Sequence, residues 1–240
     1  MERTIRVKGK VRYCDNYVDN RINMNHTKEI TKKIYMLSGL GCDKSNVSEL
    51  EKELNKFNYT IEYINLPGQF SNIDVNLENE EDFEKWRETQ IPKKSIVIGY
   101  SLGADLLVRN IERVKPDKLI ILDGAIITND FTKTTVEKEV EFSRSYIKEN
   151  SLEMNAETIS NLLYIKFKED VDVFDMHVKV KTLLLLADTP DDLYEYKKNK
   201  VEKNNNQKNI KSLFVPNTSH DFHTEKPVEI AEYIGEFLME

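Results

Sequence analysis

The sequence has few cysteines, no long apolar stretch and no cluster of metal-ligating residues, and each absence excludes a class of protein. Cys14 and Cys42 are its two cysteines and form no Cys-x-x-Cys pair, so neither a disulfide framework nor a zinc knuckle is predicted. The longest apolar run, Leu183 to Ala187, is far too short to span a bilayer. Because the amino terminus also lacks the apolar region of a secretory signal, we expect a soluble, cytoplasmic protein without membrane insertion or a bound metal.

The charge balance is acidic, with a formal net charge of -7 at pH 7. Lysines and arginines are not interleaved with aromatic residues in the way that a single-strand nucleic-acid binder requires. Nucleic acid and anionic membranes are therefore not expected as partners, and a small-molecule substrate is favoured. The length of 240 residues suffices for one domain with a sizeable core, so we predict a single domain over residues 1–240. The sequence leaves a homodimer open.

Short apolar runs that alternate with helical patterns indicate a mostly parallel α/β sheet with helices on both faces. The runs are almost continuously apolar, as expected of strands that are covered on both sides. Residues Ile5 to Tyr13 differ, because apolar and basic residues alternate there and predict an antiparallel edge hairpin. The predicted strands are Ile34–Leu37, Tyr59–Ile64, Ser95–Ile98, Lys118–Leu122, Thr182–Ala187 and Ser212–Val215, and helical spacing is found at 47–57, 104–114 and 230–237.

The third predicted strand ends in a Gly-x-Ser-x-Gly pentapeptide, residues 99–103, which then continues as a helix. A serine at such a sharp strand-to-helix turn has a strained backbone, and small flanking residues are needed because a side chain there would collide with its neighbours. Ser101 is therefore predicted to present its hydroxyl as a nucleophile above the carboxyl edge of the sheet. The backbone N–H of Leu102, at the helix N-terminus, is predicted to stabilise an oxyanion.

A serine hydroxyl needs a base that takes its proton, and the chain has four histidines. His26 precedes the first parallel strand and His177 lies in a segment without predicted strands, so both are interpreted as surface residues. His220 follows the last strand, in the loop before the carboxy-terminal helix, where a base can reach the nucleophile. We therefore predict His220 as the base, with His223 as its competitor.

The acid that orients the base is expected after the fifth predicted strand, which gives the chain order serine, aspartate, histidine. Asp188 and Asp191 both stand there. Thr189 as N-cap, Pro190 at the first helical position and acidic residues after it would equally describe an ordinary helix start. Asp123, after the fourth strand, is a third candidate, so the choice stays open among these aspartates.

The loop after the first predicted strand, Ser38-Gly39-Leu40-Gly41, contains two glycines that let the backbone approach a ligand closely. The N–H of Leu40 is predicted to pair with that of Leu102 as the second oxyanion donor. Gly39 and Tyr100 are predicted to contact the substrate. An ordinary strand-to-helix turn would explain the glycines equally well.

About fifty residues, 127–179, contain no predicted strand and only two amphipathic helical patterns. Placed at the carboxyl edge of the sheet, this insertion would form a small helical lid above Ser101 and supply apolar walls for the substrate. A structural elaboration without a role in binding is the alternative. Tyr164, Phe167 and Phe174 are candidates for the pocket wall and, equally, for ordinary core.

These motifs resemble the α/β-hydrolase superfamily over about residues 34–240. Its landmarks appear in order: Ser38-Gly39-Leu40-Gly41, Leu66-Pro67-Gly68, the turn at Ser101, and His220 followed by Glu225-Lys226-Pro227. The resemblance implies an α/β-hydrolase fold and the activity of a carboxylesterase, thioesterase, lipase or C–C bond hydrolase, without a metal or an organic cofactor. The sequence departs from the family at Ser38, where the family often has histidine.

A second departure concerns the acid. The family's Gly-x-x-Asp motif aligns with Ala187-Asp188-Thr189-Pro190, so proline stands at the position of the acid. Asp191 then lies one residue late and Asp188 two residues early. By this resemblance Asp191 is the favoured acid and Asp188 the second choice, ahead of Asp123.

We therefore predict a serine esterase or thioesterase that cleaves a small to medium, partly apolar acyl substrate through an acyl-enzyme. Ser101 attacks the carbonyl carbon, His220 takes the proton, and the N–H groups of Leu40 and Leu102 hold the oxyanion. The alternatives are a thioesterase for carrier-bound acyl chains, a C–C bond hydrolase or lyase with the same residues, and a non-catalytic binding protein on this fold.

Overall fold

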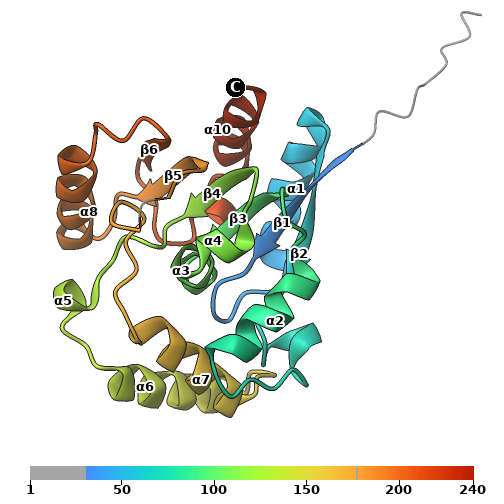
Figure 1. Ribbon diagram of the computed structural model, residues 1–240, viewed down its shortest axis with the longest axis vertical. Coiled ribbons are helices and arrows are strands. Elements are labelled where there is room, and N and C mark those ends of the chain that lie inside the picture. The colour runs from blue at the N-terminus through green and yellow to red at the C-terminus, as the bar shows by residue number, and fades with distance from the viewer. Residues whose placement is uncertain (1–30, 177) are drawn as a thin grey trace, which may run out of the picture.

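The computed structural model describes residues 31–176 and 178–240 of the chain. Figure 1 shows a central sheet with helices around it and the carboxy-terminal helix at the edge of the molecule. The predicted hairpin at Ile5–Tyr13, Cys14 and the histidines His26 and His177 lie outside the described residues.

Six strands form a fully parallel sheet in the order β2-β1-β3-β4-β5-β6, which confirms the predicted sheet. The chain adds β2 on one side of β1 and then returns to place β3 on the other side. Such a reversal opens a crevice between the carboxyl ends of β1 and β3, where parallel α/β sheets bind ligands. The strands are β1 (Lys32–Leu37), β2 (Tyr59–Ile64), β3 (Ile96–Tyr100), β4 (Lys118–Leu122), β5 (Lys181–Ala187) and β6 (Ile210–Val215).

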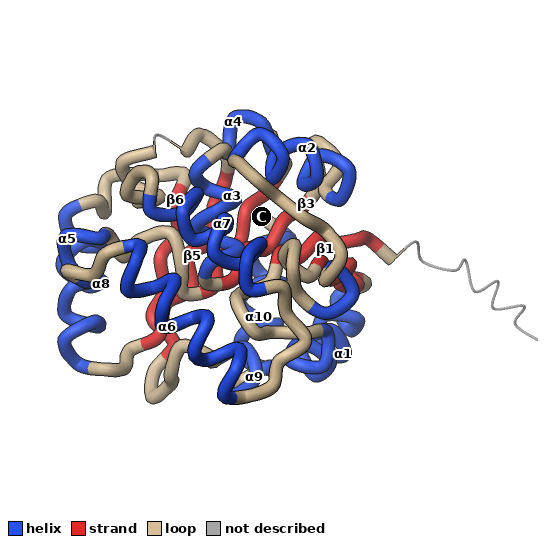
Figure 2. The backbone as a smooth tube through the Cα atoms, turned by 90° about the horizontal axis from the view of Figure 1, so that it is seen from below, coloured by secondary structure: helices blue, strands red, loops and turns tan. Residues whose placement is uncertain are grey.

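Helices cover both faces of the sheet, which is why its strands are buried and almost continuously apolar (Figure 2). Side chains alternate between the faces along each strand. Leu37 and Val97 belong to one buried cluster, with α3, and Met36 and Ile98 belong to the other, with α1 and α10. The helices are α1 (Ser48–Leu54), α2 (Glu80–Gln90), α3 (Leu102–Arg109), α4 (Ile111–Val114), α5 (Asn129–Thr132), α6 (Val136–Glu149), α7 (Ala156–Phe167), α8 (Asp191–Lys203), α9 (Phe222–Glu225) and α10 (Pro227–Met239), and 3₁₀ helices span Lys44–Val47, Asn55–Phe57 and Phe70–Asn72.

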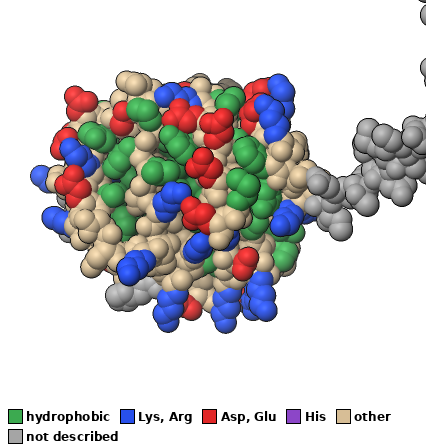
Figure 3. All heavy atoms as spheres, turned by 90° about the horizontal axis from the view of Figure 1, so that it is seen from above, with side chains coloured by type: hydrophobic (Ala, Val, Ile, Leu, Met, Phe, Trp, Pro, Cys, Tyr) green, Lys and Arg blue, Asp and Glu red, His purple; other side chains and the backbone are tan. Residues whose placement is uncertain are grey.

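The outer surface carries charges of both signs. Figure 3 shows one face on which acidic, basic and apolar side chains all occur. Within residues 31–176 and 178–240, every helix is too short or too polar to cross a membrane.

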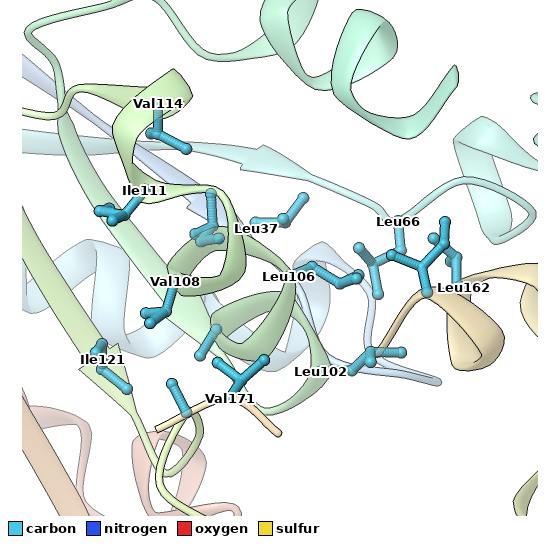
Figure 4. Packing of buried hydrophobic residues seen from close by; sticks show 14 of the residues in the cluster. Leu37, Leu66, Leu102, Leu106, Val108, Ile111, Val114, Ile121, Leu162 and Val171 are labelled. Atoms are coloured by element: carbon cyan, nitrogen blue, oxygen red, sulfur yellow. The ribbon is translucent and has the colours of Figure 1, made fainter. Parts of the chain in front are cut away.

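Helices α6 and α7 pack against each other between β4 and β5 in the sequence, at the two helical patterns predicted within residues 127–179. The side chain of Asn155 accepts N–H groups of the first turn of α7. Figure 4 shows Leu162 of α7 near Leu66 and Leu106, and Leu106 belongs to α3. The N–H of Asn155 also donates to the carbonyl of Gly68 at 2.7 Å. The helical pair is therefore joined to the helix that follows the serine turn and to the loop after β2.

Helix α2 was not predicted from the sequence, and helix α8 was described there only by its start. Helix α2 begins after Asn79, whose side chain accepts the N–H of Asp82, and acidic residues in its first turn favour a helix start. Helix α8 begins at Asp191, with Pro190 as its N-cap in place of the predicted Thr189. It continues to Lys203, into a segment rich in lysine and asparagine that is typical of a solvated loop or of a fraying helix end.

Candidate active site

Ser101 lies in the turn between β3 and α3, where its backbone is strained. Its φ is 51° and its ψ is -123°, an unfavourable combination for a residue with a side chain. The Ser101 N–H donates to the carbonyl of Leu122 at 3.0 Å, which fixes the turn against β4. A Cβ on Gly103 would lie 2.3 Å from the carbonyl oxygen of Ser38. Only glycine therefore lets α3 approach the loop after β1 this closely.

His220 lies in the loop after β6 and reaches the serine. Its Nε2 atom is 2.8 Å from Ser101 Oγ. Asp188 holds this loop, because its carboxylate accepts the N–H groups of Asn217 at 2.8 Å and of Thr218 at 2.9 Å. Desolvation raises the pKa of Asp188, but these hydrogen bonds outweigh it, so the pKa lies below its ordinary value. Asp188 thus binds the backbone that carries His220.

Asp123 contacts the other ring nitrogen of His220, with 2.7 Å between His220 Nδ1 and Asp123 Oδ2. The sequence predicted that Asp191, or Asp188 as second choice, would contact His220. This prediction is wrong, because the contact is made by Asp123. Asp191 is exposed in the first turn of α8, where a carboxylate favours the helix start. The reason lies in the strand order: the end of β4, next to β3, brings Asp123 under the imidazole, while the end of β5 brings Asp188 to the loop backbone.

The loop that carries Asp123 passes directly over the serine turn. A Cβ on Gly124 would lie 2.6 Å from the carbonyl oxygen of Ser101, so this position requires glycine. The N–H of Ala125 donates to the carboxylate of Asp105 in α3 at 2.6 Å. Burial raises the pKa of Asp105, a side chain that Lys166 of α7 also approaches to 3.4 Å. The loop that carries Asp123 is therefore fixed to the helix that begins after Ser101.

Asp123 is almost completely buried, with 1% of its side chain exposed, and it is paired on both oxygens. Its Oδ1 accepts Lys197 Nζ at 2.6 Å and the N–H of Ala187 at 3.0 Å. Burial raises the pKa of Asp123, but the hydrogen bond from His220 and the charge of Lys197 outweigh burial, so its pKa lies below its ordinary value. Sequence reasoning missed Lys197, although its spacing of four residues from Val201 places it on the inner side of α8.

The loop after β1 lies at the same edge of the sheet as Ser101. Gln69 is fully buried behind this loop; its Oε1 accepts the N–H of Gly41 at 2.6 Å, and its Nε2 donates to the carbonyl of Gly39 at 3.5 Å. The N–H of Leu40 has no hydrogen-bond acceptor among the described residues. Gln69 was not predicted from the sequence. Its side chain holds both peptides that flank Leu40.

A cavity of about 410 Å³ opens over Ser101 and His220. Leu40 and Tyr100 line it, as does Tyr146 from α6, so the helical pair contributes to its wall. The Tyr100 hydroxyl donates to the carboxylate of Asp221, and burial raises the pKa of Tyr100 above its ordinary value. Tyr164, Phe167 and Phe174 are not among the described residues that line this cavity, and neither is Gly39, which was predicted to contact the substrate.

His223, the predicted competitor of His220, makes no hydrogen bond to Ser101. It is 1% exposed, and its ring lies 4.3 Å from that of Tyr100 between ring centroids. Burial lowers its pKa to about 4. Neither ring nitrogen has a hydrogen-bond partner in the described part of the chain. No group of three His, Cys, Asp or Glu residues among those described could hold a metal ion.

Several solved structures share this architecture. An esterase from Exiguobacterium antarcticum matches with a TM-score of 0.64 at 11% sequence identity, over 87% of this chain and 92% of that chain. An alpha/beta hydrolase enzyme from the metagenome of lagoon sediments of Mar Chica, Morocco, matches with a TM-score of 0.57 at 15% identity, over 87% and 90%. The thioesterase domain from the curacin biosynthetic pathway matches with a TM-score of 0.50 at 14% identity, over 85% and 90%.

The chain therefore has the α/β-hydrolase fold, as the resemblance in its sequence implied. The solved structures that share it include esterases and a thioesterase domain. No protein-family model matches the sequence, and no curated protein matches it either.

Proposed function

We propose that this protein is a serine hydrolase that cleaves an ester or thioester of a small to medium acyl substrate through an acyl-enzyme. The observation that carries the proposal is the continuous line of contacts from Ser101 through His220 to Asp123, at 2.8 and 2.7 Å. With its Nδ1–H donated to Asp123, the neutral imidazole keeps Nε2 free to accept the serine proton. About half of the His220 side chain is exposed, which gives water access for the second half-reaction.

The reaction begins with attack of Ser101 Oγ on the carbonyl carbon, while its proton passes to His220 Nε2. The developing oxyanion is held by two backbone N–H groups, those of Leu102 and Leu40. Leu102 opens α3, so its N–H has no acceptor within the helix. His220 then protonates the leaving alcohol or thiol. In the second half it activates water, which releases the acid and restores Ser101.

The cavity supports a compact substrate. A volume of about 410 Å³ lies near the lower end of the range that small-molecule sites occupy. Leu40 and Tyr146 offer apolar contact to an acyl chain, and Tyr100 and Asp221 offer polar contact. Because Tyr146 comes from α6, we propose that α6 and α7 act as the lid of this site within a single domain.

A free ester or thioester is favoured over an acyl chain on a carrier. The cavity lining includes the carboxylate of Asp221 and, among the described residues, no lysine or arginine. A phosphopantetheine arm or an acidic carrier protein would be repelled by this charge and would need a basic surface instead.

The proposal is tested with a fluorophosphonate probe and a panel of p-nitrophenyl esters and acyl-CoA thioesters of several chain lengths. Wild-type protein should be labelled covalently and should turn over short to medium substrates, and Ser101→Ala should abolish both. Ser219→Ala is the matched control, because Ser219 lies beside His220 but bonds to Glu225; it should keep labelling and turnover. Labelling that survives in Ser101→Ala would overturn the nucleophile, and turnover confined to acyl-CoA would favour the carrier-type thioesterase.

A further inference from the structure

A lysine lies buried beneath the proposed triad. Lys197, in the middle of α8, has a fully buried side chain, and its Nζ is 2.6 Å from Asp123 Oδ1. A buried ammonium costs several kcal/mol unless it is paired with a well-placed anion. An apolar residue at this position would fill the space without that cost. The lysine is therefore better explained by what it does to Asp123 than by its contribution to the core.

The two oxygens of Asp123 are used differently. Oδ1 accepts Lys197 Nζ and the N–H of Ala187, while Oδ2 faces His220 Nδ1 at 2.7 Å. The ammonium thus fixes the rotation of the carboxylate and leaves one oxygen for the imidazole. It also counters the negative charge that the imidazole faces, because an anion alone would favour the protonated imidazolium.

We propose that Lys197 is a positioning residue that keeps His220 in its neutral, proton-accepting form. This inference rests on the proposed function, in which a neutral His220 takes the serine proton. Without the lysine charge, the buried Asp123 carboxylate would be balanced by protonated His220 instead. The resting enzyme would then hold an imidazolium that cannot act as a base until the pH is raised.

Other charged or titratable groups also face His220 and Asp123. These residues are the same in the wild type and in every variant at position 197. Asp105 and His223 act on the charge of His220, and Tyr100 faces Asp123. Asp221 adjoins His220 in the chain, and Cys42 and Asp221 face Tyr100. A difference between variants at position 197 therefore reports on the lysine.

The test compares Lys197→Met, which removes both charge and donor, with Lys197→Gln, which removes the charge but keeps a donor for Asp123. Lys200→Met is the matched control. Lys200 lies three residues further along α8 and pairs with Asp172 away from the triad. For each protein, the pH dependence of kcat/KM is measured together with the titration of the His220 ring protons by NMR, assigned with His220→Gln.

In both Lys197 variants the midpoint of His220 and the acid limb of kcat/KM should move together to higher pH, by about one pH unit or more. At high pH, Lys197→Gln should keep more of the wild-type kcat than Lys197→Met, because a donor still orients the carboxylate. Lys200→Met should lower the melting temperature but leave the midpoint unchanged. Should Lys197→Met fail to fold, Lys197→Gln gives the same comparison.

The inference is overturned if the midpoint stays at the wild-type value in the Lys197 variants, or if Lys200→Met moves it as far. The NMR titration needs no substrate. A wild-type protein without hydrolase activity would therefore refute the proposed function while the titration still decides the role of Lys197.

Discussion

Acid should destabilise this protein through His223, a buried histidine whose two ring nitrogens have no hydrogen-bond partner in the described part of the chain. Its ring lies between Tyr100 and Phe222, with ring centroids 4.3 and 6.4 Å away. Burial lowers its pKa to about 4, and repulsion from a charged His220 acts in the same direction, while Asp221 and Glu225 partly oppose both. Protonation would place a positive charge in a buried site where neither ring N–H has a hydrogen-bond acceptor among the described residues.

The magnitude follows from linkage. The folded protein holds a neutral His223 down to a pKa of about 4, whereas in the unfolded chain the ring takes up a proton near its ordinary pKa of 6.5. As the pH falls below 6.5, the unfolded state binds a proton that the folded state does not. The stabilisation is therefore fully present above pH 6.5 and is lost progressively as the pH falls to about 4. The difference corresponds to about 3 kcal/mol of unfolding free energy.

Urea unfolding of the wild type and of His223→Phe at several values between pH 7 and pH 4 measures this loss. The wild type should lose about 3 kcal/mol more than His223→Phe over this range, because the phenyl ring cannot take a proton and the other titrating groups are common to both proteins. Phe83→Leu, a change at a buried ring that packs against Trp86 and not against His223, should lower stability at every pH and keep the wild-type slope. Equal slopes in the wild type and His223→Phe would refute the reasoning.

Two further predictions concern the loop that carries Asp123. Asp123→Asn should lower kcat by about 10⁴-fold, because an amide favours the wrong tautomer of the histidine. Asp191→Asn should leave kcat near the wild-type value. Steady-state kinetics with one ester measures both effects, and the reverse order would assign the acid to Asp191 in α8. Gly124→Ala should lower kcat by about 100-fold, since the added Cβ would meet the carbonyl of Ser101 at 2.6 Å and displace this loop. Gly235→Ala, which meets Phe57 at 2.7 Å far from the site, should lower the melting temperature with little change in kcat, and equal kcat in both variants would contradict the role of the loop.

The strands and the serine turn could be predicted from the sequence because their signals are local. Ser101 stands in a Gly-x-Ser-x-Gly pentapeptide directly after an apolar run, and both parts of the signal lie within nine residues. The candidate base was also accessible, because only His220 and its competitor His223, among the four histidines, follow the last predicted strand.

The partner of His220 could not be chosen from the sequence because the choice depends on contacts between distant segments. Asp123, Asp188 and Asp191 all follow predicted strands, and which of them reaches the imidazole is set by the order of the strands in the sheet. A local hint was present, since Asp123 is followed by Gly124 at a point where the chain crosses the serine turn. Lys197 had a still weaker signal, because a lysine in a helix is ordinarily exposed.

Gln69 makes two parts of the site mechanically dependent on each other. Its side chain holds the peptide of Gly41, and its backbone pairs with Met154, in the connection between α6 and α7. An outward swing of this connection would pull Gln69 and withdraw support from the loop that carries Leu40. At the other end of the pair, Lys166 and Lys168 hold α7 to Asp105 and Glu80. We therefore expect the end of α6 near α5 to be the part that moves, so that substrate enters from that side while the loop that carries Leu40 keeps its shape.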